Sequence, residues 1–305
     1  MVERAIEHVK KDDFAAVLKI QTVALKAVHD FLSEKGLVQL MPVMLSTVTD
    51  PLNHPVYDSS IRYGGKKLEL TKSMILHKQM ALMHDGIKGL YIVSPNIRLE
   101  MEDTGKSGRH LAEFSQVDIE LKEAETKDFM GLMEEMYTYV IKTVKEKCET
   151  ELKELGRELK VPERPFPVFD SSELKEKYGE DFEAKKSEEM DSIFWITNHE
   201  REFYEKKHEK GHHVNYDIVY PEGFGEALSG GEREHEYEKI LKKMKDTKVS
   251  PESYGPYIEI AKKGLLRPSA GGGFGVERLV RFLTGKKHIK EVTMFPRVPG
   301  EEIII

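Results

Sequence analysis

The chain is short of several residue types that mark particular protein classes. It has one cysteine, Cys148, and one tryptophan in 305 residues. A single cysteine can form neither an internal disulfide nor a thiolate metal cluster, which is consistent with a reducing compartment. No apolar run reaches the length needed to cross a bilayer, and the N-terminus does not resemble a signal peptide. We therefore expect a cytoplasmic protein with no membrane partner.

An excess of positive charge is missing as well. The formal net charge is −7 although 33% of the residues are charged, so acidic and basic side chains are interleaved. Such a pattern is typical of a solvated surface, and it also resembles the ion-pair networks that gain value at high temperature. A nucleic-acid binder usually carries a basic patch, so we expect no nucleic-acid partner. The 39% hydrophobic content supports a core, and we expect one domain over residues 1–305.

Hydrophobic periodicity predicts a mixed architecture. Apolar residues recur at helical spacing over 12–35 and 126–155, whereas 90–93, 111–121 and 214–220 read as strands. Residues 46–65 are rich in Pro, Asn, Asp, Ser and Gly and predict an irregular loop. Strands joined by hairpin-like loops, with helices grouped apart from them, predict an α+β fold with an antiparallel sheet flanked by helices.

A glycine run ahead of an apolar helix is the most informative local feature. Gly271-Gly272-Gly273-Phe274-Gly275 leads directly into Val276-Glu277-Arg278-Leu279. Glycines allow close backbone approach to a ligand, and a helix start with a fixed cation suits anionic groups. The run predicts either a phosphate site or a tight turn before a packed helix.

A second segment combines Arg98-Leu99-Glu100 with residues 109–120. An arginine can hold a phosphate in fork geometry, Glu100 can accept from an adenine amino group, and Phe114 offers a face for stacking a base. Gln116 and Asp118 share one strand face with Phe114, and Asp118 suits a substrate ammonium. The alternative is an edge strand with solvated charges.

A third segment runs from Asp217 to His235. Asp217 and Glu226 lie at opposite ends of a turn and suit Mg²⁺ bridging nucleotide phosphates, with Ser229 as a further oxygen ligand. The glycines that follow Ser229 allow close approach, and Arg233 would clamp a carboxylate. A glycine-punctuated hairpin is the alternative.

Together and in this order, the segments resemble the catalytic domain of class II aminoacyl-tRNA synthetases, in the aspartyl/asparaginyl branch. The resemblance spans about residues 12–300. It rests on the following stretches: Phe31 to Pro42 for the first motif, Arg98-x-Glu100 through Arg109-His110-Leu111-x-Glu113-Phe114 for the second, Gly273-Phe274-Gly275-Val276-Glu277-Arg278 for the third, with Ser229-Gly230-Gly231-Glu232-Arg233-x-His235 and Met294-Phe295-Pro296-Arg297.

The resemblance implies roles for individual residues. The predicted ATP site comprises Arg98 on the α-phosphate, Arg278 on the γ-phosphate, Glu100 and Phe114 at the adenine, and His110 at the β- or γ-phosphate. Asp217, Glu226 and Ser229 would organise Mg²⁺, so Arg98, Arg278 and Glu226 form the predicted catalytic set. Lys78 and Arg233 would grip a free carboxylate, with Gln116 and Asp118 on the amino group. Two cations favour aspartate over neutral asparagine.

We expect a catalytic domain alone, without the N-terminal anticodon-binding domain of the synthetases. In this it resembles the archaeal asparagine synthetases related to them. That resemblance implies ATP-dependent conversion of aspartate and ammonia to asparagine, through an aspartyl-adenylate with release of AMP and pyrophosphate, in a homodimer. The alternatives are a truncated synthetase paralogue that transfers an activated amino acid to tRNA or protein, and a non-catalytic amino acid sensor.

Making asparagine requires activation of the side-chain carboxyl, so aspartate would have to bind end-for-end. Three departures from the family pattern, at Ile75, Arg267-Pro268-Ser269 and Glu232, suggest the hypothesis that the amino-acid pocket is re-shaped for this pose. Glu232 is also a candidate base for deprotonating ammonium.

Overall fold

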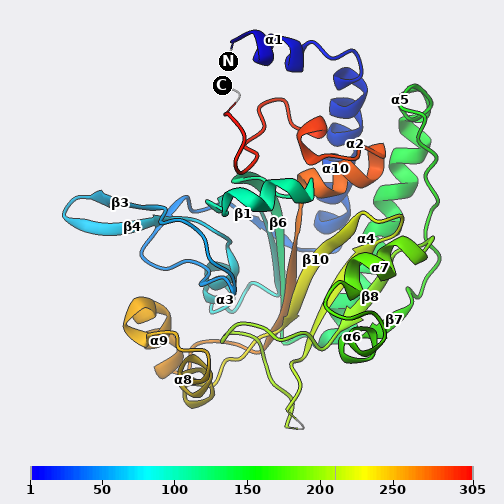
Figure 1. Cartoon of the computed structure of the whole chain (residues 1–305). Helices are drawn as coiled ribbons and strands as arrows, with labels where there is room; N and C mark the ends of the chain where they lie inside the picture. The colour runs from blue at the N-terminus through cyan, green and yellow to red at the C-terminus, as the bar shows by residue number, and fades with distance from the viewer. Residues whose placement is uncertain (1, 210, 304–305) are drawn as a thin grey trace.

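A mostly antiparallel eight-stranded sheet forms the centre of the protein (Figure 1). The computed structural model describes residues 2–209 and 211–303. The strands follow the order β1 (Val38–Leu40), β5 (Gly89–Ile97), β6 (Glu113–Lys122), β11 (Ser269–Gly275), β10 (Gly225–Glu232), β9 (Asn215–Tyr220), β8 (Phe194–Thr197) and β7 (Val168–Asp170). Only the outer pairs β1–β5 and β7–β8 are parallel. The predicted α+β fold with an antiparallel sheet is confirmed.

Helices cover the apolar face of this sheet. Those in contact with it or with one another are α2 (Phe14–Glu34), α4 (Thr126–Lys147), α5 (Glu149–Glu154) and α10 (Val276–Thr284). Inward-facing residues of the strands, such as Val117, Ile119 and Phe274, join them in the largest core cluster. Because side chains alternate along a strand, the neighbouring positions point to the other face, where the candidate site lies.

The remaining helices frame the sheet. The segment α3 (Ile75–Ala81) packs on β6 and contacts α9 (Gly255–Lys262), while α8 (Tyr237–Asp246) lies beside α9 (Figure 1). On the other side α7 (Phe182–Glu189) packs on β9 and β10, next to α6 (Ser171–Tyr178). The other short elements are α1 (Val2–Val9) and the 3-10 turns η1 (Glu102–Ser107), η2 (Pro251–Tyr254) and η3 (Ile289–Val292).

A small second sheet projects from the body. It contains β2 (Leu45–Ser46), β4 (Lys66–Leu70) and β3 (Ser60–Tyr63), and its β3–β4 hairpin extends away from the central sheet (Figure 1). The segment expected to be an irregular loop over 46–65 therefore contains part of this hairpin. Its residues 47–59 remain irregular and reach the site, where Val56 forms an isolated bridge with Glu100.

Two predicted elements differ in extent. The single helix expected over 126–155 is divided at Cys148, whose backbone leaves helical geometry at φ −125° and ψ 34°, so α4 and α5 are separate. The strand expected over 90–93 continues through Pro95 to Ile97. A proline is tolerated there because β1 pairs only with residues 90–92, which leaves β5 an open edge beyond them.

Among the helices of residues 2–209 and 211–303, none combines the length and apolar character needed to span a bilayer.

Candidate active site

The polar face of the central sheet forms the floor of a cavity of about 290 Å³. Phe114, Gln116 and Asp118 of β6 all line it, as the period-2 pattern predicts. Ser229 and Arg233 contribute from β10 and the residues just after it. Gly273, Gly275 and Arg278 line it as well, so the structure brings residues of all three sequence segments into one cavity.

The glycine runs lie inside the sheet, which corrects the expectation of a tight turn before the helix. Gly273 and Gly275 line the cavity, and the phosphate site stays a prediction. Gly271 and Gly273 belong to β11 and Gly231 to β10, all at the centre of the sheet. A Cβ on Gly271 would overlap the Glu120 carboxylate, and one on Gly231 would overlap the carboxylate of Glu205. The glycines therefore leave room for buried carboxylates of the protein itself.

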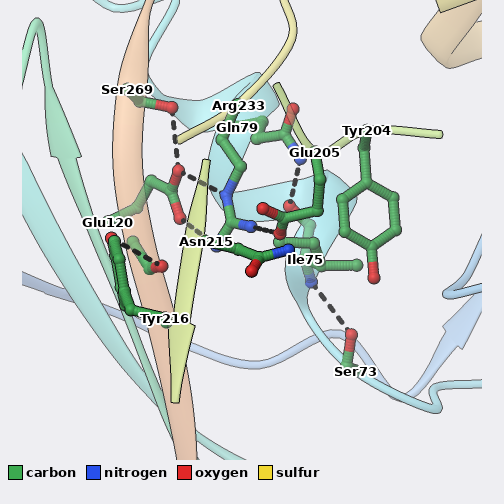
Figure 2. A network of polar contacts seen from close by, with 12 residues as sticks. Ser73, Ile75, Gln79, Glu120, Tyr204, Glu205, Asn215, Tyr216, Arg233 and Ser269 are labelled. Atoms are coloured by element: carbon green, nitrogen blue, oxygen red, sulfur yellow. Dashed lines mark hydrogen bonds and ion pairs between the residues drawn. The ribbon is translucent and has the colours of Figure 1, made fainter. Parts of the chain in front are cut away.

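Arg233 lies between those two carboxylates (Figure 2). Its Nε donates to Glu120 Oε1 at 3.1 Å, and its Nη1 donates to Glu205 Oε1. Ser269 Oγ donates to Glu120 Oε1 at 2.8 Å and completes the support of this group. Although burial opposes it, Arg233 and Lys78 lower the pKa of Glu120, so Glu120 stays ionised. Arg233 is thus paired before any substrate contact is made.

Lys78 is a buried residue of the same floor, with 1% of its surface exposed. Its Nζ donates to Asp118 Oδ1, to the Ile119 carbonyl and to the Gly272 carbonyl, each at 3.2 Å, and lies 3.3 Å from Glu120 Oε2. An ammonium has three protons, so it would bind a substrate carboxylate only by giving up one of these contacts.

The two cations Lys78 and Arg233 no longer favour aspartate over asparagine, because carboxylates of the protein itself face them. Lys78 and Arg233 face the carboxylates of Asp118, Glu120 and Glu205. Burial raises the pKa of Glu205 to about 7 against the opposing effect of Arg233. The floor is therefore close to neutral or negative, and it presents both signs of charge.

The predicted adenine residues also lie in this cavity. The Arg98 guanidinium lies 5.2 Å from the centroid of the Phe114 ring, and its Nε donates to the Lys72 carbonyl at 3.0 Å. Glu100 is 3.0 Å from His54 Nε2, from the loop over 47–59. Burial opposes ionisation of Glu100, but the hydrogen bond from His54 lowers its pKa. Glu100 would thus release or share its hydrogen bond with His54 when it accepts a hydrogen bond from an adenine amino group.

Arg278 and His110, the predicted contacts of the terminal phosphates, also line the cavity. Glu226 Oε1 is 3.1 Å from Arg278 Nη1. Although burial opposes it, Arg278 and Arg109 lower the pKa of Glu226 to about 2. Burial together with the same two arginines lowers the pKa of His110 to about 4, so His110 is a neutral imidazole at pH 7. Its Nδ1 is 2.6 Å from Ser107 Oγ.

The predicted magnesium ligands are brought together only in part. Glu226 and Ser229 line the cavity, whereas Asp217 lies behind Arg201, whose Nη2 is 2.5 Å from Asp217 Oδ2. Asp217 Oδ1 is buried without a hydrogen-bond partner. In the described part of the chain, no three His, Cys, Asp or Glu side chains are grouped to hold a metal. A magnesium ion would therefore depend on Glu226, Ser229 and phosphate oxygens.

Gln116 and Glu232 have clear partners. Asn96 Nδ2 donates to Gln116 Oε1 at 2.6 Å, which orients the amide within the cavity. Glu232 accepts from the Thr126 amide at 3.0 Å and pairs with Lys206 at 2.7 Å, and it does not line the cavity. The suggestion that Glu232 deprotonates ammonium is therefore not supported, because its carboxylate is committed to the start of α4.

Comparison with known proteins explains why these residues converge. The model of the class II tRNA synthetases for D, K and N matches residues 1–299. The chain belongs to this family. It is 33% identical to the aspartate–tRNA(Asp/Asn) ligase of Methanopyrus kandleri over 97% of this chain and 70% of that protein. It is 28% identical to the asparagine–tRNA ligase of Pyrococcus abyssi over 96% of this chain and 70% of that protein.

A solved structure confirms the synthetase fold. The asparaginyl-tRNA synthetase of Pyrococcus horikoshii, solved with asparaginyl-adenylate, superposes with a TM-score of 0.88 at 24% identity. The match covers 98% of this chain and 72% of that chain. The resemblance to the aspartyl/asparaginyl branch of the class II synthetase family is thus confirmed, whereas nothing in these matches concerns the synthesis of free asparagine.

Several site residues of this class II synthetase chain were not identified from sequence. Glu120 and Glu205 hold Arg233, and Asp50 accepts from Ser73 Oγ at 2.9 Å at the edge of the cavity. Glu120 continues the alternation of Gln116 and Asp118, so the period-2 pattern contains a signal for it. Glu205 carries no such signal, because its approach to Arg233 is a contact between distant segments.

Proposed function

We propose that this cavity activates aspartate or asparagine with ATP as the aminoacyl-adenylate and passes the acyl group to an acceptor. One observation carries the proposal: Arg98, which lies over Phe114, and Arg278 line the same cavity as Arg233 and its charge network. Two arginines and an aromatic face suit a nucleotide, and the mixed charges of the floor suit an amino acid.

The activation step needs positioning and charge neutralisation. A substrate carboxylate oxygen attacks the α-phosphorus, the acyl–phosphate bond forms, and the bond to pyrophosphate breaks. Arg98 and Arg278 would neutralise the charge that gathers on the phosphate oxygens. Glu226 is ionised across the physiological range and orients Arg278 from 3.1 Å. No side-chain nucleophile is required for this step.

Magnesium fits the nucleotide end of the cavity. A bound ion would supply further charge neutralisation at the phosphates. Glu226 and Ser229 are the residues that would hold it, because both line the cavity. We propose that Asp217 contributes through Arg201, which it positions at 2.5 Å, rather than by reaching the phosphates directly.

The relatives make tRNA the first acceptor to test. Both curated relatives named above are tRNA ligases, so net charge alone is a weak reason to exclude nucleic acid. In that reaction a hydroxyl of the acceptor attacks the acyl carbon, and AMP leaves.

Ammonia is a second candidate acceptor, and the floor is the observation that favours it. Aspartate bound end-for-end would place both an ammonium and a carboxylate on the floor. Asp118 and Glu205 offer the carboxylates, and Lys78 and Arg233 the cations. Ammonia would then attack the activated side-chain carbonyl, lose one proton, and release AMP and asparagine.

Amino-acid-dependent exchange of labelled pyrophosphate into ATP tests the activation. We expect exchange with aspartate, asparagine or both, in the presence of Mg²⁺. Adding tRNA or ammonium then separates the acceptors, through labelled aminoacyl-tRNA or through free asparagine with stoichiometric AMP. Absence of exchange with either amino acid would contradict the proposal and favour the sensor.

A further inference from the structure

Two carboxylate oxygens on the cavity floor lack hydrogen-bond partners. They are Asp118 Oδ2 and Glu205 Oε2, and both side chains line the cavity. Asp118 is 2% exposed and Glu205 is 3% exposed, so neither oxygen has ready access to bulk water. A buried acceptor without a partner is unfavourable by itself, and such a group commonly awaits a ligand donor.

The remaining atoms of both groups are fully used. Asp118 Oδ1 accepts from Lys78, and Glu205 Oε1 accepts from Arg233. The protons of Lys78 have internal acceptors, as described above. When both groups are ionised, which for Glu205 means above its pKa of about 7, their open hydrogen-bonding capacity is that of acceptors. The ionised floor therefore calls for a ligand that donates.

Glu205 is fixed in place by contacts on several sides. Its backbone forms an isolated bridge with Arg233, and its carbonyl accepts from Lys243 Nζ of α8. Its carboxylate occupies the space that a Cβ on Gly231 would fill. Figure 2 shows the Glu205 carboxylate beside the Arg233 guanidinium, so this long acidic side chain is held in place on one side by Arg233 and on another by Gly231.

We infer that Glu205 binds the nitrogen-bearing end of the amino acid and so determines which end of the substrate enters the pocket. This inference rests on the proposed function. The substrate group bound here would carry an N–H donor next to an oxygen acceptor. The nitrogen would donate to Glu205 Oε2, and the oxygen would face Arg233. Either the carboxamide of asparagine or the zwitterionic head of end-for-end aspartate supplies that pair.

A structural role alone, in which Glu205 only neutralises Arg233, makes a different prediction. Removing the charge would then affect every ligand by a similar factor. If Glu205 contacts the nitrogen directly, its substitution weakens only those ligands that carry the nitrogen. Changing the residue and the ligand separately and together measures this coupling, as in a double-mutant cycle.

The test measures dissociation constants for the full chain by calorimetry, with ATP-dependent exchange alongside. The variant is Glu205→Gln, and the matched control is Glu232→Gln, a carboxylate on the same sheet that lies outside the cavity. The ligand pairs are asparagine against aspartate β-methyl ester, and aspartate against succinate. The first pair replaces the amide NH2 group with OCH3 and keeps the carbonyl oxygen, and the second removes the α-amino group and keeps both carboxylates.

We expect loss of the nitrogen to weaken binding about tenfold or more in the wild-type protein, because a charged hydrogen bond is lost. This loss of affinity should be smaller in Glu205→Gln and unchanged in Glu232→Gln. Shrinkage in the asparagine pair identifies a carboxamide at the floor, and shrinkage in the aspartate pair identifies the zwitterionic head. Equal penalties in all three proteins would overturn the inference.

A second variant guards against misfolding of the first. Glu205→Asp keeps the charge but withdraws the carboxylate by one methylene, so the same penalty should fall in part. If the wild-type protein shows no exchange with any amino acid, the proposed function fails. If the wild-type protein is active but loss of the nitrogen weakens binding equally in the Glu205 variants, only the role of Glu205 is overturned.

Discussion

His110 lines the cavity together with the cationic side chains of Arg109 and Arg278. Burial and these two cations lower the pKa of His110 to about 4, below the usual 6.5. Nucleotide phosphates would bring negative charge to the arginines and favour the imidazolium. We therefore predict that ATP raises the pKa of His110, so that nucleotide binding takes up a proton between pH 4 and 6.5.

Titration of the imidazole signal by NMR, with and without ATP, checks this prediction, and His110→Gln assigns the resonance. A pKa near 6.5 in the absence of nucleotide, or no shift on adding it, would contradict the electrostatic description of this end of the cavity.

Glu205 gives the second prediction at this scale. Burial raises the pKa of Glu205 to about 7, with Arg233 opposing and Glu202 adding to the rise. Glu120, Arg201, Tyr204, Tyr216 and Lys243 are the other ionisable groups that face it. Folding holds a proton that the unfolded chain has already lost, so the stabilisation is complete below about pH 4.5 and is lost as the pH rises through about 7.

We expect the stability of the wild-type protein relative to Glu205→Gln to fall by roughly 1–3 kcal/mol between pH 4.5 and pH 8. Denaturant unfolding at both pH values measures this difference, and Glu232→Gln serves as the control. A difference that does not change with pH would show that Glu205 titrates as an ordinary carboxylate.

The same residues show what sequence could supply. The period-2 spacing placed Phe114, Gln116 and Asp118 together on the cavity wall, as found. The pairing of Arg233 with Glu205 depends on a bridge between segments that no local pattern relates. The shared face of these three residues could thus be predicted, whereas the charge balance around Arg233 required the structure.

At the scale of elements, the glycines of strand β11 are expected to be required for packing of the sheet. Gly271 faces the Glu120 carboxylate and the Ile119 carbonyl, which leave no room for a methyl group. We predict that Gly271→Ala lowers the free energy of unfolding by about 2 kcal/mol or more, because backbone and a buried ion pair must shift.

Gly131→Ala is the matched control. Gly131 lies on the exposed side of α4, where an added methyl group would meet no other atom within 4 Å, and alanine is the better helix former. This variant should gain up to about 1 kcal/mol. Chemical denaturation of both variants provides the comparison. Equal stabilities would mean that the β11 glycines are not required by packing.

Helices with a clear apolar stripe were predicted well from sequence, because their pattern is local. The expected helix over 12–35 corresponds to α2. The hairpin that was one reading of residues 217–235 corresponds to β9 and β10. Strand β11 was read as a turn or a phosphate site, because the run from Gly271 has low strand propensity. Packing against buried carboxylates overrides that propensity.

At the scale of the molecule, the resemblance of residues 31–42 to the first family motif leads us to propose a homodimer. Apolar side chains near this segment are exposed, including Val38 at 42%, Met41 at 82% and Leu45 at 40%. We predict a dimer in sedimentation equilibrium that Met41→Glu weakens at least tenfold, because a buried charge without a partner is unfavourable.

Val168→Glu at the opposite edge of the sheet is the control, since Val168 is 55% exposed and should leave the assembly unchanged. A wild-type protein that stays monomeric at micromolar concentration would contradict the proposed dimer.

The central claim is that one cavity activates aspartate or asparagine with ATP. Pyrophosphate exchange tests it most directly, in the wild-type protein and in Arg278→Lys, with Arg267→Lys as a control outside the cavity. We predict amino-acid-dependent exchange that Arg278→Lys reduces by about 100-fold, because the fork geometry toward phosphate is lost, while Arg267→Lys retains it. No exchange in the wild-type protein, or full exchange in Arg278→Lys, would contradict the account.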